Sequence, residues 1–158
     1  MTDVPGGRPH RRRDVGPGIG ARHHLAVHLD GEAAAVVDEL RARWDPTMRR
    51  ITPAHVTVAY PEETVDRDLL LTRAARVARE SPAFQACLAR FATRDDGRGG
   101  VVALVDDVDG GLETMRDRLL LPPQRFSGFP FHATIAHPRT AQNTVGCWAQ
   151  LGGTGLDV

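Results

Sequence analysis

The pattern of apolar and polar positions divides the chain into short alternating segments and amphipathic helices. Apolar and polar residues alternate over residues 23–29, which is typical of a half-buried strand. Apolar residues at helical spacing then predict a helix that is capped by Asp30 and runs to about Trp44. The later predicted elements are a helix capped by Thr64 and running to about residue 80, strands over residues 84–93 and 101–105, a helix over 111–120 and a last helix capped by Thr140.

Two nine-residue segments are copies of one pattern. They read PAHVTVAYP over residues 53–61 and PFHATIAHP over residues 130–138, and they agree in both prolines, the histidine, the threonine and the following alanine. β-branched residues in the middle and a proline at each end predict a short strand in each segment. Each predicted strand follows a predicted helix, so the order of elements indicates an internal duplication of a strand-helix unit.

The alternation of side chains along a strand places the polar residues of each copy on one face. His55 and Thr57 share a face of the first strand, and His132 and Thr134 share a face of the second. The apolar residues between them point the other way. Each copy therefore presents a titratable ring beside a hydroxyl, and two such faces could enclose one phosphate from both sides.

Composition narrows the class of protein. The 158 residues carry 20 Lys and Arg against 20 Asp and Glu, and this balance argues against a protein that coats long nucleic acids by charge alone. Residues 1–20 are rich in Gly, Pro and Arg, which predicts a disordered tail, and residues 21–158 form the expected folded domain.

No apolar run is long enough for a membrane span, and the arginine cluster near the start is not followed by the apolar stretch of a signal peptide. Two cysteines without metal-ligand spacing favour reduced thiols in a cytoplasmic protein.

The two His-x-Thr segments resemble the motifs of the two-histidine (2H) phosphoesterase superfamily. Within it, residues 23–151 are most similar to the branch of 2′-5′ RNA ligases and RNA 2′,3′-cyclic phosphodiesterases. The resemblance implies a bilobal α+β fold with antiparallel sheets around a central cleft, and no metal or other cofactor. It also implies that His55 is the proton donor and His132 the proton acceptor, with Thr57 and Thr134 binding the phosphate.

The chain departs from the family pattern after the second motif. Many relatives carry an arginine soon after the second threonine, whereas this chain has His137 there and Arg139 two positions later. Arg139 is therefore a candidate phosphate contact, and Tyr60 is a candidate for stacking on a base. The 20 residues after Pro138 do not include an obvious strand, so a C-terminal strand could be missing and a sheet edge could be exposed.

These observations predict a metal-independent phosphodiesterase that opens 2′,3′-cyclic phosphate ends of RNA or small cyclic nucleotides. The same site could join 2′-5′ ends in the reverse direction. A non-catalytic module that binds nucleotides or RNA ends is the alternative. A metal site at His23, His24 and His28 is a third hypothesis, but no carboxylate lies at a matching spacing. The expected partner is the RNA end or nucleotide itself, with no membrane, and we expect a monomer.

Overall fold

The computed structural model describes residues 23–64 and 66–156, which form one antiparallel sheet with helices packed against it. The strands lie in the order β1-β2-β5-β4-β3, and every neighbouring pair is antiparallel. The strands are β1 (Leu25–His28), β2 (His55–Ala59), β3 (Cys87–Thr93), β4 (Val101–Asp106) and β5 (His132–Ala136). The helices of this part are α1 (Gly31–Trp44), α2 (Pro46–Ile51), α3 (Arg67–Glu80), α4 (Gly111–Leu119) and α5 (Thr144–Leu151), with the 3₁₀ turn η1 (Pro61–Glu63).

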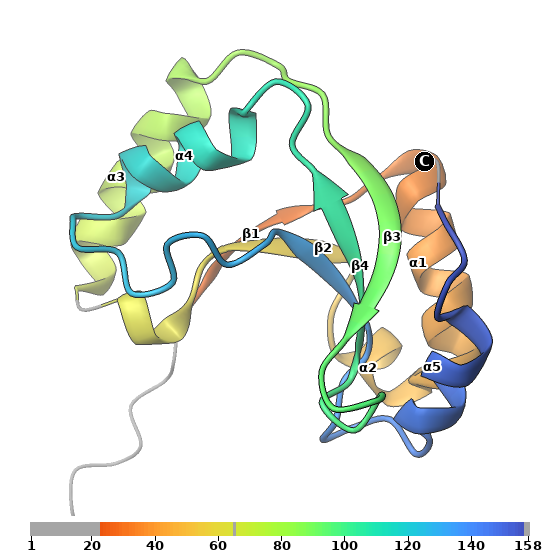
Figure 1. Ribbon diagram of the computed structural model, residues 1–158. Coiled ribbons are helices and arrows are strands. Elements are labelled where there is room, and N and C mark those ends of the chain that lie inside the picture. Colours follow the sequence, from red (N-terminus) through yellow and green to blue (C-terminus); the bar gives the residue numbers. More distant parts are fainter. Residues whose placement is uncertain (1–22, 65, 157–158) are drawn as a thin grey trace, which may run out of the picture.

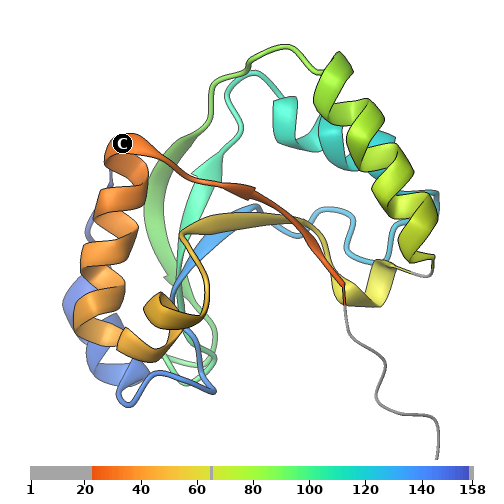
Figure 2. The ribbon, with the colours of Figure 1, turned by 180° about the vertical axis from the view of Figure 1, so that it is seen from behind.

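The predicted α+β class is confirmed. The resemblance implied more than one sheet, whereas the described residues form a single sheet of five strands. Figures 1 and 2 show two groups of helices at opposite ends of this twisted sheet, with α3 and α4 in one group and α1, α2 and α5 in the other. The two predicted motif strands are β2 and β5, and they are neighbours at the centre of the sheet.

Two hydrophobic clusters fill the space between the helices and one face of the sheet. Val56 and Val58 of β2 pack with α3 and α4 in the first cluster. Ala133 and Ile135 of β5 pack in the second, with residues of α1, β3, β4 and α5. Because Val56 is paired with Ala133, both clusters lie on the same face of the sheet. The helices therefore cover the apolar face of both motif strands, and the polar face stays open.

Two of the three predicted helix caps are wrong, and the third is right in position only. Asp66, not Thr64, caps α3 by accepting from the backbone N–H groups of Asp68 and Leu69, while the Thr64 hydroxyl donates to a carbonyl of the preceding turn. Asn143 caps α5, because the Thr140 hydroxyl donates instead to a distant carboxylate. Asp30 is the N-cap residue of α1 as predicted, but its side chain makes no capping hydrogen bond. A local turn binds the Thr64 hydroxyl and a tertiary contact binds the Thr140 hydroxyl, so neither is available as a cap.

Two further segments differ from prediction. Helix α2 was not predicted, and it begins at a proline whose preceding residue, Asp45, accepts from the backbone N–H of Met48. The segment after α5 lies along the outer edge of β3, where Gly155 bridges Arg90 and the Leu156 N–H donates to the Ala89 carbonyl at 2.6 Å. The expectation of an unpaired edge is therefore wrong at this point of β3. The predicted tail over residues 1–20 lies outside the described residues.

Candidate active site

The register of β2 against β5 brings the two motifs together. Val56 is paired with Ala133, so the alternation of an antiparallel ladder sets His55 opposite Thr134 and Thr57 opposite His132. All four side chains lie on the open face of the sheet. The two histidines occupy diagonal positions of this group, and diagonal neighbours on one face lie roughly 7–8 Å apart. This spacing leaves room between the two rings for a small anion.

Each histidine is oriented by the proline two residues before it. Nδ1 of His55 lies 2.8 Å from the carbonyl oxygen of Pro53, and Nδ1 of His132 lies 2.9 Å from that of Pro130. A carbonyl oxygen can only accept, so Nδ1 carries the hydrogen in both rings and Nε2 is left to accept or donate a proton. Within the described residues neither Nε2 has a hydrogen-bond partner. The sequence already contained the signal, a Pro-x-His repeated in both copies, but the prolines suggested only the limits of a strand.

The two motif threonines keep their hydroxyls free. In the part of the chain that the structure describes, the hydroxyls of Thr57 and Thr134 make no side-chain hydrogen bond. A purely structural role for this motif would have each histidine bonded to its neighbouring threonine inside a packed strand. The structure does not show this arrangement. Both side chains are half-buried on the open face.

A groove of about 370 Å³ runs from His132 and Thr134 across β4 and β3. Val102 and Leu104 of β4 form part of its floor, because they pair with the two motif residues. Phe129 also lines the groove. The other lining residues are Ala92, Thr93, Arg94, Gly99, Gly100, Pro130, Ala136, His137 and Pro138.

Two other histidines lie beside His55. The ring centroids of His24 and His28 lie 6.0 and 6.5 Å from that of His55. Burial lowers the pKa of His55, while the hydrogen bond to the proline carbonyl acts in the opposite direction. Electrostatic repulsion from Arg41, and from His24 and His28 in their charged forms, lowers this pKa further. In the free protein His55 is therefore neutral at a lower pH than an ordinary histidine.

The hypothesis of a metal site at His23, His24 and His28 has no support in the structure. The described residues contain no group of three or more His, Cys, Asp or Glu side chains that could hold a metal ion. His24 and His28 are exposed, as the sequence predicted, and both rings also lie beside that of His55.

Tyr60 and Arg139, the two candidate substrate contacts, are less central than the motifs. Tyr60 packs against Phe129 with ring centroids 5.9 Å apart, and Phe129 in turn contacts the His132 ring at 5.4 Å. Burial is the main cause that raises the pKa of Tyr60 to about 12, so its hydroxyl stays protonated. Arg139 is exposed and does not line the groove, whereas His137 does.

Two hydrogen bonds hold His137, one at its backbone and one at its ring. Its N–H donates to Asp45 at 2.9 Å, and its Nδ1 accepts from the Arg139 N–H at 3.1 Å. Burial lowers the pKa of His137, and the Arg139 charge adds to this while Asp45 opposes it. His137 thus lines the groove at the sequence position where the resemblance led us to expect an arginine.

Comparison with known proteins decides the family. The family model described as 2′-5′ RNA ligase superfamily matches residues 29–151, which contain both motif strands. The chain belongs to the 2′-5′ RNA ligase superfamily. The predicted resemblance to two-histidine phosphoesterases is thereby confirmed, and membership in the 2′-5′ RNA ligase superfamily supports a phosphoesterase or ligase-like activity on RNA or nucleotides. Comparison with curated proteins gave no match. No helix in the described ranges is both long and apolar enough to cross a membrane.

Proposed function

We propose that this protein hydrolyses 2′,3′-cyclic phosphate ends of RNA, or small cyclic nucleotides, by two-histidine acid–base catalysis without a metal. The main support is the matched pair of imidazoles on one open face, each with Nδ1 bonded to a proline carbonyl and Nε2 free. Two such rings on opposite sides of a phosphorus atom could serve as base and acid for an in-line displacement.

The reaction needs one proton to be taken up and one to be given. His132 accepts a proton from water as the water oxygen bonds to phosphorus. The bond from phosphorus to one ribose oxygen then breaks, and His55 gives its proton to that oxygen. The products are a phosphomonoester and a free ribose hydroxyl. Thr57 and Thr134 donate hydrogen bonds to the non-bridging oxygens and hold the phosphate between the rings.

The assignment of donor and acceptor follows the family resemblance. His55 must be protonated to act as the donor, although its pKa is lowered in the free protein. A bound phosphodiester carries a negative charge, which favours the imidazolium form of a ring beside it. His55 therefore takes up its proton when the substrate binds.

Other parts of the site suit the rest of a nucleotide. Phe129 has 48% of its surface exposed, and Tyr60 and Phe126 pack against its ring with centroid distances of 5.9 and 6.4 Å. An aromatic ring held in this way offers a face for a base, so we propose that Tyr60 supports stacking on Phe129. We also propose that Arg139 contacts a phosphate from the rim of the site. The same site could form a 2′-5′ bond in the reverse direction. We also propose a cytoplasmic location, which two free thiols suit.

Turnover of a nucleoside 2′,3′-cyclic phosphate in excess EDTA tests this proposal. We expect the wild type to be active, and His55→Ala and His132→Ala each to lose about a hundredfold or more of kcat, as expected for loss of a general acid or base. His23→Ala is the control, because His23 is an exposed histidine next to the β1 strand. Activity that depends on a metal, or folded variants as active as the wild type, would overturn the proposal. Binding of the cyclic nucleotide without turnover would favour the non-catalytic module.

A further inference from the structure

The pairing between the two motif strands is short. β2 and β5 pair at a single position, Val56 with Ala133, whereas β4 and β5 pair at four. The catalysis proposed above requires both strands to hold their histidines at a fixed spacing. One paired position alone constrains that spacing weakly. Other contacts must therefore set the relation between β2 and β5.

A buried arginine joins the strands where β2 begins and β5 ends. Arg41 of α1 has no exposed surface, and its Nε donates to the Thr134 carbonyl at 2.8 Å. Its Nη1 donates to the carbonyl of Thr52, three residues before His55, at 3.3 Å. The guanidinium fork thus reaches the backbone of the second motif segment and of the residue directly before the first.

Asp45, one helical turn after Arg41, completes this contact. It too has no exposed surface, and its Oδ2 accepts from the His137 N–H at 2.9 Å and from the Thr140 hydroxyl at 2.6 Å. It therefore fastens the backbone immediately after β5. We call the pair Arg41 and Asp45 the Arg41 clamp.

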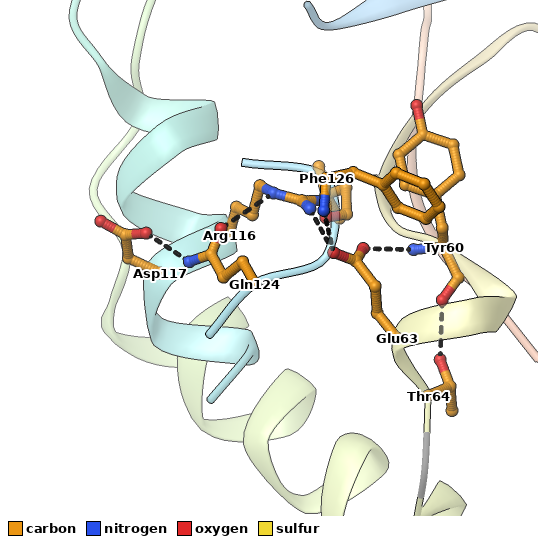
Figure 3. Close-up of polar contacts among 8 residues, drawn as sticks. Tyr60, Glu63, Thr64, Arg116, Asp117, Gln124 and Phe126 are labelled. Carbon is orange, nitrogen blue, oxygen red and sulfur yellow. Dashed lines mark hydrogen bonds and ion pairs between the residues drawn. The ribbon is translucent and has the colours of Figure 1, made fainter. Parts of the chain in front are cut away.

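A second buried arginine occupies the other end, where β2 ends and β5 begins. Arg116 of α4 donates from Nη1 to the Val58 carbonyl of β2 at 2.6 Å, and its Nη2 lies 2.5 Å from Oε1 of Glu63 (Figure 3). The same Glu63 oxygen accepts from the Phe126 N–H at 3.2 Å, in the loop that leads into β5. Its other oxygen accepts from the Tyr60 N–H at 3.1 Å. We call the pair Arg116 and Glu63 the Arg116 clamp.

The two clamps match each other in the duplicated chain. Each consists of a buried arginine and a buried carboxylate, and in the Arg116 clamp these two side chains form an ion pair. Arg116 lies on α4, directly before β5, whereas Arg41 lies on α1, with α2 between it and β2. Arg41, which precedes the first motif, reaches β5; Arg116, which precedes the second, reaches β2. Burying such charges is expensive, and pairing only partly offsets the cost. Each guanidinium donates to a main-chain carbonyl of a motif strand, which an apolar side chain could not do, so this arrangement suits a role in positioning.

We infer that Arg41 and Arg116 are positioning residues that hold β2 and β5 at the spacing where His55 and His132 bind one phosphate together. This inference rests on the proposed function. Loss of either arginine frees one end of the strand pair, so the rings no longer meet the same anion in one geometry. The phosphate then keeps contact with one ring and loses the other.

Titration with inorganic phosphate tests the inference without any need for turnover. The ring signals of His55 and His132 are followed by NMR, with assignments from His55→Gln and His132→Gln. In the wild type both rings are expected to respond with one common Kd. In Arg41→Met and Arg116→Met the phosphate affinity is expected to fall at least tenfold, with the two rings reporting different Kd values.

Two kinds of variant keep the test decisive. Arg41→Lys and Arg116→Lys retain the charge but not the fork, so they are expected to fold and to show the same separation of Kd values. Arg43→Met and Arg118→Met are the controls, because these arginines lie on the same helices and make contacts at the surface. Both controls should bind phosphate like the wild type.

The outcomes separate the two claims. If the wild-type rings do not share one phosphate, the proposed function fails. If they share it and the folded lysine variants still give one common wild-type Kd, only the positioning role is overturned. If the surface controls lose affinity as much as the buried arginines, the positioning role is also overturned, because the effect is then one of general charge.

Discussion

At the scale of single residues, the two histidines have the same hydrogen bond but different neighbours. Both rings are fixed by a proline carbonyl through Nδ1. His55 has His24, His28 and Arg41 around it, whereas the His132 ring contacts Phe129. The duplicated motif is therefore symmetric in orientation and asymmetric in electrostatics. This asymmetry gives a way to tell the acid from the base.

Replacing His24 and His28 together by asparagine removes two of the positive neighbours of His55. The pKa of His55 is then expected to rise, because the charges that lower it are gone while burial remains. If His55 is the donor, it stays protonated to higher pH, and the alkaline limb of the kcat/KM profile moves to higher pH. The measurement is kcat/KM for a nucleoside 2′,3′-cyclic phosphate from pH 5 to 9, with His23→Asn as the matched control. A shift of the acidic limb alone would contradict the assignment and make His55 the acceptor.

At the scale of elements, the local pattern predicted much of what formed. Alternation and bracketing prolines were enough to place the two motif strands, and helical spacing was enough for α1, α3 and α4. The caps were less predictable, because Thr64, Asp66, Thr140 and Asn143 are all chemically able to cap. Which residue caps each helix depends on other contacts. The turn after β2 binds the Thr64 hydroxyl, and a carboxylate 95 residues away binds the Thr140 hydroxyl.

The cap of α3 can be tested directly. Asp66→Ala removes the acceptor for two backbone N–H groups and is expected to lower the free energy of unfolding by about 1 kcal/mol. Thr64→Ala, the cap expected from sequence, removes only a 3.3 Å hydrogen bond to the Tyr60 carbonyl and should cost clearly less. Urea unfolding of both variants makes the comparison. Equal losses would contradict the assignment of Asp66 as the cap.

At the scale of the whole molecule, the sequence predicted the composition of the site better than its construction. The spacing of the motifs indicated that His55, Thr57, His132 and Thr134 would act together. Nothing local indicated that Arg41 would reach a carbonyl 93 residues away. The place of β1 beside β2, which sets His28 next to His55, likewise depends on the register of the sheet. Such long-range partners follow from topology, which one sequence does not specify locally.

The stability of the fold is expected to depend on pH through two histidines. The pKa values of His55 and His137 are lowered in the folded protein, so below about pH 6.5 the unfolded chain binds more protons than the folded one. The free energy of unfolding should therefore fall as the pH drops from about 6.5 and level off below the folded pKa values. Urea unfolding at a series of pH values measures this.

The contribution of each histidine can be separated in the same experiment. His55→Asn and His137→Asn should each make the fall below pH 6.5 shallower, because each removes one group that protonates preferentially in the unfolded chain. His23→Asn, at an exposed histidine, is the control. A fall that is equally steep in both site variants would show that other groups cause it.

The central claim is that the two motifs act as one catalytic unit on one phosphate. Comparing kcat/KM of His55→Ala, His132→Ala and the double variant on one 2′,3′-cyclic nucleotide tests this most directly. Residues that act as a unit are strongly non-additive. We therefore predict that the double variant is within a few-fold of the weaker single variant. Losses that multiply in the double variant would mean that the two histidines act independently, and would contradict the claim.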